Sequence, residues 1–256
     1  MLWNYMKIDF KRAFLNWKCI IVILVVYGLL QYNNIENTNV ISWIYRVFSV
    51  QFIIISMAVA SATYATSIID ERNHKYKMLM IVRGNPVSYI LSKIVVIFIS
   101  TIITFFVAFC LAAFVNYIRY GLPDADTLNS LRDSRGAYLE MVYDQKFIGY
   151  VVACALQLSF FAGVMSLIGV MISLFFRNRI IVYCFPVIMV YIDDIFMERT
   201  FGWEKAATRS LKYLVIDQIC MKVPGQSVPL AYIQMACYAI ILGYFIIYVS
   251  KRKLDD

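Results

Sequence analysis

Six long apolar runs constrain this chain more than any other feature of its sequence. An α-helix needs about 20 predominantly apolar residues to cross a membrane core of about 30 Å. The runs lie at residues 17–32, 47–69, 94–118, 147–176, 180–197 and 229–249. Few charges interrupt them, so the sequence predicts an all-α polytopic membrane protein with six transmembrane helices.

The composition supports the same fold class. Of the 256 residues, 62% are hydrophobic and only 16% are charged, whereas soluble domains are about half apolar and a quarter charged. The excess apolar surface must face lipid, which excludes an ordinary cytosolic enzyme and a disulfide-rich secreted scaffold. Residues 1–256 are expected to form a single transmembrane domain. The net charge of +8 indicates orientation and contact with the lipid bilayer, and no nucleic-acid partner.

Basic residues predict the orientation of the chain. More than half of the 24 Lys and Arg residues gather in four segments, namely residues 1–18, the loop after the second run, the turn after the fourth run and the C-terminal tail. Because short cytoplasmic loops carry an excess of Lys and Arg, both termini are expected in the cytoplasm. The abundance of Ile, Asn, Lys and Tyr suggests an AT-rich genome, so we expect a multi-pass protein of a bacterial plasma membrane.

Residues 1–18 have the pattern of an amphipathic helix that lies in the membrane interface. Apolar and aromatic residues recur at helical spacing, with polar residues largely on the opposite side. The apolar set is Trp3, Met6, Phe10, Phe14 and Trp17, and the polar set is Asn4, Lys7, Lys11 and Lys18. An aromatic face backed by lysines is typical of interfacial helices; a solvated tail is the alternative.

Two further segments are expected outside the membrane. Residues 119–146 are polar and contain a Gly-Leu-Pro-Asp turn at 121–124. Residues 198–228 mix charged and apolar residues ahead of the Pro224-Gly225 turn. A helix in the second segment could dip into the outer leaflet before the last span, as a re-entrant hairpin.

Sequence motifs of catalysis are missing. The chain has no GxxxxGK[ST] phosphate loop, no GxSxG and no HExxH, and its single histidine is His74. The six cysteines form no CxxC pair, and five of them lie inside apolar runs. We therefore expect no catalytic residue, no metal site and no cofactor bound by this chain itself.

Polar residues inside the spans are candidates for a translocation pathway. Asp193 and Asp194 are the conspicuous pair, since a charge in hydrocarbon is costly and marks function by default. Asp193 follows Arg177 by 16 residues, about 24 Å along a helix, so an interfacial position near the outer boundary is the competing interpretation. Gln51, Thr63 and Gln157 are weaker candidates, because such residues often bond between helices.

Small residues form two seams at helical spacing. Ala58, Ala62 and Thr66 step by four, and a second seam contains Ala162, Ser166, Gly169 and Ser173. Seams of this kind let helices pack closely. The spacing leaves open whether they pack within one subunit or between subunits.

The loop at residues 70–93 carries the most information about function. A charged start, Asp70-Glu71-Arg72, precedes the apolar stretch 78–82. A Gly-Asn-Pro break follows, and a helix restarts at Pro86. The pattern predicts a short amphipathic helix at the cytoplasmic surface between the second and third spans.

At these residues the sequence resembles the type-2 permease subunits of ABC transporters. The resemblance rests on Glu71-Arg72 after the second span, Pro86-Val87-Ser88, and Lys93 opening the third span. It implies a coupling helix that docks on a separate ATPase subunit, with ATP and Mg²⁺ bound by that partner. The implied contact residues are Glu71, Arg72, Lys75, Met78, Leu79 and Val82, with Arg177, Asn178 and Arg179 as a second contact. Residues 203–222 would form the re-entrant external hairpin.

The function implied is the membrane half of an exporter. Two six-span subunits, either identical copies or paralogues, would enclose the pathway. The abundance of aromatic residues favours an amphipathic or hydrophobic cargo such as a peptide or bacteriocin, a lipid or a drug. Two alternatives remain at this point: a membrane-embedded enzyme acting on lipid or peptide, and a membrane sensor or anchor subunit.

Overall fold

The computed structural model describes most of the chain, and all of its regular elements there are helices. The described residues are 2–15, 17–32, 39–48, 50–63, 65, 67–69, 86–123, 138–176, 178–201 and 228–255. The helices are α1 (Leu2–Phe14), α2 (Trp17–Tyr32), α3 (Val40–Val47), α4 (Val50–Ala62), α7 (Pro86–Tyr120), α9 (Leu139–Tyr143), α10 (Phe147–Ser173), α11 (Arg179–Phe201) and α14 (Val228–Asp255).

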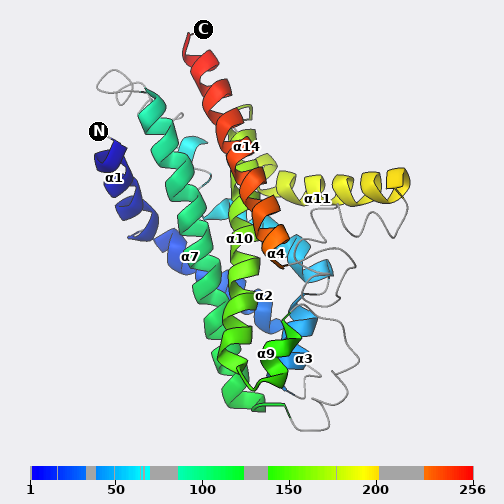
Figure 1. Cartoon of the computed structure of the whole chain (residues 1–256). Helices are drawn as coiled ribbons and strands as arrows, with labels where there is room; N and C mark the ends of the chain where they lie inside the picture. The colour runs from blue at the N-terminus through cyan, green and yellow to red at the C-terminus, as the bar shows by residue number, and fades with distance from the viewer. Residues whose placement is uncertain are drawn as a thin grey trace.

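Helix α10 is the centre of the molecule. It contacts α4, α7, α9, α11 and α14, and from Cys154 to Ser173 nearly all of its residues are buried. Figure 1 shows α7, α10 and α14 running in the same general direction, with α2 crossing behind them. A helix that is apolar on every side is expected in such a central position.

Helix α7 is the longest element, and its ends follow local rules. It begins at Pro86, a residue favoured in the first helical turn. It ends at Tyr120, and the next residue, Gly121, has a left-handed φ of 72° and donates its N–H to the Tyr117 carbonyl. Its 35 residues extend about 52 Å at 1.5 Å per residue, which exceeds the membrane core of about 30 Å.

One end of the bundle carries both chain termini, together with the start of α7 and the end of α10 (Figure 1). We call it the terminal end. A buried cluster joins α7, α10 and α14 there and includes Tyr89, Ile94, Leu174 and Ile246. The two termini therefore lie on the same side of the bundle.

Four helices are long and apolar enough to cross a membrane, and a fifth is counted if α1 and α2 form one bent span. Those four, α7, α10, α11 and α14, correspond to the predicted runs 94–118, 147–176, 180–197 and 229–249. The run 17–32 coincides with α2, which has only 16 residues. The run 47–69 is divided among the end of α3, α4 and a short continuation to Ile69. The protein is thus a helical multi-pass membrane protein with four or five candidate spans.

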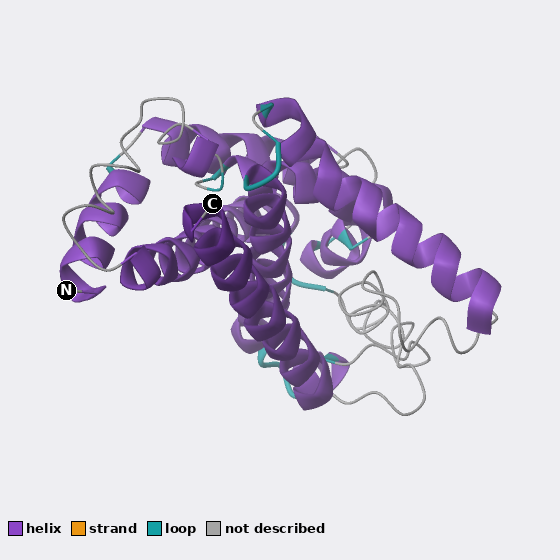
Figure 2. Cartoon of the chain, turned by 90° about the horizontal axis from the view of Figure 1, so that it is seen from above, coloured by secondary structure: helices purple, strands orange, loops and turns teal. Residues whose placement is uncertain are grey.

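The direction of α11 differs from that of its neighbours. Figures 1 and 2 show it projecting sideways from the bundle, across the direction of α10. Only 18% of its most apolar window is buried, because it touches α4 and α10 and little else. Its length and hydropathy are those of a span, and among the described residues its direction is set by its packing on α4 and α10.

The N-terminal helix is shorter than the expected 1–18 segment. Helix α1 ends at Phe14, and Trp17 and Lys18 begin α2 after a bend of 55°. The reason is that α1 packs along α7, so the chain must turn before α2 can pack against α4 and α7. Trp3 remains 72% exposed and Trp17 76% exposed.

The small-residue seam of α10 packs inside this subunit. Ala162, Ser166, Gly169 and Ser173 are all buried within the chain. A Cβ on Gly169 would lie 2.7 Å from Ser61 Oγ of α4. This seam therefore packs within one subunit and not between subunits. In the α4 seam, Ala58 and Ala62 are partly buried, and Thr66 lies outside the described residues.

Candidate functional site

The terminal end contains a buried ion pair between two helices that are far apart in sequence. Lys93 Nζ of α7 lies 2.8 Å from Asp9 Oδ1 of α1, and the two side chains are only 2% and 5% exposed. Ser92 Oγ lies 3.1 Å from Asp9 Oδ2 and 2.8 Å from the Tyr89 carbonyl oxygen, and its one proton is shared between these two acceptors. A charge in apolar surroundings is retained where it is paired and hydrogen-bonded, and this pair meets both conditions.

Aromatic contacts extend the junction between α1 and α7. The rings of Tyr5 and Tyr89 meet edge to face, with centroids 5.9 Å apart. The Lys93 ammonium also lies 5.8 Å from the centroid of the Tyr89 ring, within the range of a cation–π contact. Tyr5 and Asp9 are spaced by one helical turn, as are Tyr89 and Lys93, so each helix presents two successive turns to the other.

Ala13 completes the packed face of α1. It is 7% exposed and follows Tyr5 and Asp9 at the same four-residue spacing. The exposed Lys7 and Lys11 lie on the opposite side of the helix. Helix α1 therefore has a third face, which neither the aromatic nor the basic pattern of the sequence reveals.

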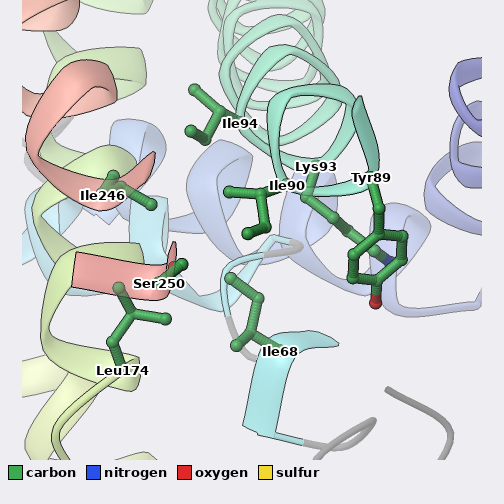
Figure 3. Close-up of a pocket in the computed structure, with 8 residues that line it drawn as sticks. All are labelled: Ile68, Tyr89, Ile90, Lys93, Ile94, Leu174, Ile246 and Ser250. Atoms are coloured by element: carbon green, nitrogen blue, oxygen red, sulfur yellow. The ribbon is translucent and has the colours of Figure 1, made fainter. Parts of the chain in front are cut away.

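On the other side of Lys93 is a small pocket with aliphatic walls. It is formed where the ends of α10 and α14 and residue Ile68 approach the start of α7 (Figure 3). The lining residues are Ile68, Tyr89, Ile90, Lys93, Ile94, Leu174, Ile246 and Ser250. In Figure 3 the Lys93 side chain extends away from Ile246 and Leu174 toward Tyr89. Its methylene stem forms part of the wall while its ammonium binds Asp9.

Most of the expected coupling residues lie outside the described part of the chain: Glu71, Arg72, Lys75, Met78, Leu79, Val82 and Arg177. Asn178 and Arg179 are described and exposed. Asn178 Oδ1 accepts the N–H of Ile180 at 2.9 Å, which makes Asn178 the N-terminal cap of α11.

The pathway candidates are distributed over different helices. Thr63 is 8% exposed, and its Oγ1 lies 2.8 Å from Thr101 Oγ1 of α7. Gln157 is fully buried in α10, and Asp193 is half-buried on α11. The side chains of Gln51 and Asp194 lie outside the described residues. Thr63, Gln157 and Asp193 do not line the pocket at the terminal end.

Tyrosines gather at the opposite end of the bundle. Tyr138, which precedes α9, is 7% exposed, and Tyr150 of α10 is 1% exposed. Burial, followed by the nearby Tyr232, raises the pKa of the Tyr138 phenol far above its ordinary value. The hydroxyl therefore stays protonated at any physiological pH, and this cluster anchors α9 on the bundle.

Sequence reasoning missed Asp9 entirely and recognised Lys93 only as part of a family resemblance. A signal for Asp9 does exist, because Tyr5, Asp9 and Ala13 form a stripe at four-residue spacing that belongs to neither the aromatic nor the lysine face. A lone acid in a basic helix, on a face of its own, favours a partner on another helix.

These features define a class of protein: a polytopic helical membrane protein with an N-terminal helix bound at the end of the bundle that carries both termini. The sequence profile of the family described as "ABC-2 family transporter protein" matches residues 17–197. The match covers more than half of the chain, and the chain belongs to this family. Searches of curated proteins and of solved structures find no match to the chain.

Membership makes the chain an ABC transporter permease, the membrane component of a transport system. Such components are generally non-catalytic, and the family implies ABC ATPase partners. The expected class of protein is confirmed.

Proposed function

We propose that the chain is the permease subunit of an ABC exporter of a bacterial plasma membrane. It dimerises with a second copy or a paralogue and binds separate ATPase subunits, which carry ATP and Mg²⁺. The observation that carries the proposal is the family match over residues 17–197, on a helical membrane body whose sequence has no phosphate loop of its own.

The proposed coupling element is the segment that precedes α7. Its proposed contact residues are Glu71, Arg72, Lys75, Met78, Leu79 and Val82. Arg177, Asn178 and Arg179 would form a second, smaller contact with the ATPase subunit. Both segments join helices at the terminal end, since Ile69 and Pro86 flank the first, and Phe176 and α11 flank the second. The basic residues of this end favour a cytoplasmic location for both termini.

Transport would proceed by alternating access between two permease subunits. ATP binding would close the ATPase pair and shift the docked segments, and the helices that follow them would rearrange. ATP can shift this equilibrium only through its different affinity for the two states. Gln51, Thr63, Gln157, Asp193 and Asp194 are the proposed polar contacts of the pathway. The abundance of aromatic residues favours an amphipathic or hydrophobic cargo, such as a peptide, a lipid or a drug.

The first experiment is purification of the tagged chain from native membranes in mild detergent, with mass spectrometry of the proteins that accompany it. We expect a stoichiometric nucleotide-binding subunit. Recovery of the chain alone, or with a partner that binds no nucleotide, would contradict the proposal.

The second experiment tests the coupling segment with the double substitution Glu71→Ala/Met78→Asp. We expect the complex to keep its ATPase activity while transport falls by about tenfold, because coupling changes are typically of this size. The matched control is Glu140→Ala/Met141→Asp in α9, where both residues are exposed at the opposite end of the bundle. Unchanged transport in the first variant would rule out this segment as the coupling element.

A further inference from the structure

The start of α7 is held by polar contacts on one side and by apolar packing on the other. Toward α1 it forms the Asp9–Lys93 ion pair, the Ser92 hydrogen bond and the Tyr5–Tyr89 ring contact. Toward α10 and α14 it faces the aliphatic pocket that Ile90, Ile94, Leu174 and Ile246 line. Polar bonds are directional and costly to break in a dry site, whereas apolar contacts are non-directional.

We propose that α1 and the first turns of α7 move as one body, with Asp9 and Lys93 as the positioning residues that join them. The movement takes place against α10 and α14, on the side of the pocket. This inference rests on the proposed function, because the coupling segment leads directly into Pro86 and would apply its displacement there.

A buried ion pair is suited to join α1 and α7, because it keeps one geometry when the helices move. Lys93 lies two turns into α7, within reach of any displacement of Pro86, and its side chain is only 2% exposed. An exposed pair would be screened by salt and would exchange partners with water. Such an exposed pair exists at the other end of the bundle, between Lys146 and Asp144, whose side chains are 70% and 62% exposed.

The amphipathic character of α1 gives this joint a consequence. Its packed face is held on α7, while Trp3 and Lys7 stay exposed on other sides. A helix with these exposed residues is suited to the membrane surface. Displacement of the start of α7 would therefore also displace α1 along that surface, and α1 in turn would limit how far α7 can move.

The first arm of the test measures the joint without any nucleotide. Spin labels are placed at Lys7→Cys and Val87→Cys, both exposed positions, in a background that lacks the native cysteines. We expect a narrow distance distribution in the otherwise unchanged chain. Asp9→Asn or Lys93→Met alone should broaden it, because each removes the opposite charge from a buried ion pair.

Two further variants distinguish loss of the ion pair from general misfolding of the protein. Asp9→Leu/Lys93→Met replaces the pair with apolar side chains that can pack together, and we expect the distribution to narrow again. Lys146→Met removes the lysine of the exposed pair, and we expect no change. A distribution that stays narrow in both buried single variants would overturn the proposal.

The second arm measures transport per ATP hydrolysed in the reconstituted complex. We expect each buried single variant to lower this ratio by about tenfold at unchanged ATPase activity, and the apolar double variant to recover it. Broadened distances with an unchanged ratio would show that the pair is structural only, which overturns the inference while leaving the proposed function intact. Absence of an ATPase partner would refute the proposed function, and the first arm would still decide whether the joint exists.

Discussion

Close packing between α4 and α10 depends on a glycine, Gly169, at the point where the two helices touch. The space beside Gly169 is occupied by Ser61, whose Oγ and Cβ would lie 2.7 and 3.0 Å from an added Cβ. Membrane helices gain stability mainly from close contact of small residues, because lipid is as apolar as their side chains. Gly169 therefore determines how near α4 can approach the central helix.

We predict that Gly169→Ala destabilises the protein. The added methyl group would overlap the Ser61 side chain, which is too short to move aside without a shift of the α4 backbone. Overpacking of this kind costs about 1–3 kcal/mol. The measurement is the midpoint of thermal unfolding in detergent. Gly28→Ala is the matched control, since nothing lies within 4 Å of its added Cβ; an equal effect of both substitutions would contradict the packing argument.

The pair of Thr63, which follows α4, and Thr101 of α7 allows a role in the pathway to be separated from a structural role. Thr63 Oγ1 lies 2.8 Å from Thr101 Oγ1, and each hydroxyl also donates to a carbonyl of its own helix, Ala60 or Ile97. Two hydroxyl protons are thus shared among three hydrogen bonds, so the bond between the two threonines is only partly occupied.

For Thr63→Val we expect a loss of stability of only about 0.6 kcal/mol, the average for hydrogen bonds between membrane helices. If Thr63 also contacts cargo, transport should fall while the unfolding midpoint hardly changes. Thr101→Val removes the same bond from the other side and serves as the control. Equal and small effects of the two variants on transport would assign Thr63 to helix packing alone.

At the scale of elements, α11 is the least buried of the four candidate spans. It carries Asp193 half-buried on a helix whose neighbours Tyr191 and Ile192 are 57% exposed. Pro186 interrupts its backbone hydrogen bonding. A carboxylate on an otherwise lipid-facing helix needs water, a polar partner or cargo nearby.

We predict that Asp193→Asn/Asp194→Asn lowers transport by about tenfold at normal expression, because function is the default interpretation of acids in a span. Transport of a fluorescent amphiphile in vesicles is the measurement. Glu198→Gln, an exposed acid one turn further along α11, is the control. Transport equal to that of the unchanged protein would favour the interfacial interpretation of the two aspartates.

At the scale of the whole molecule, the bundle has one end with both termini and one end with α9. The sequence predicts that the loops of the first end are rich in basic residues and that the charge-mixed segments 119–146 and 198–228 lie outside the membrane on the opposite side. The segment 198–228 lies mostly outside the described residues, so its proposed hairpin stays a prediction.

Thiol labelling of intact cells tests this orientation. Of the six cysteines only Cys220 lies in a predicted external segment, so we expect a membrane-impermeant maleimide to label the chain there and Cys220→Ser to abolish the labelling. A cysteine introduced at Lys251, exposed near the C-terminus, should react only after the cells are opened. Labelling of that position in intact cells would contradict cytoplasmic termini.

The sequence alone determined the helical class and most helix positions. The starts and ends of α7 and α10 follow from apolar runs, Pro86 and Gly121, because helix hydrogen bonds join residues only four apart and lipid forces every backbone group to form them. It also determined the family, through residues around the loop before α7. The number of spans is less well determined, since α2 and α4 are short and their boundaries depend on neighbouring helices.

Only the tertiary structure decided which faces meet. The Asp9–Lys93 pair joins residues 84 positions apart, and Gly169 meets Ser61 across two helices. Periodicity shows that a helix has a distinctive face but not which partner covers it, because that choice depends on the packing of all the other helices. The same physical reason applies to α1. Its aromatic and basic faces are evident from residue spacing, but only the packing of α7 shows that the face of Tyr5, Asp9 and Ala13 is buried.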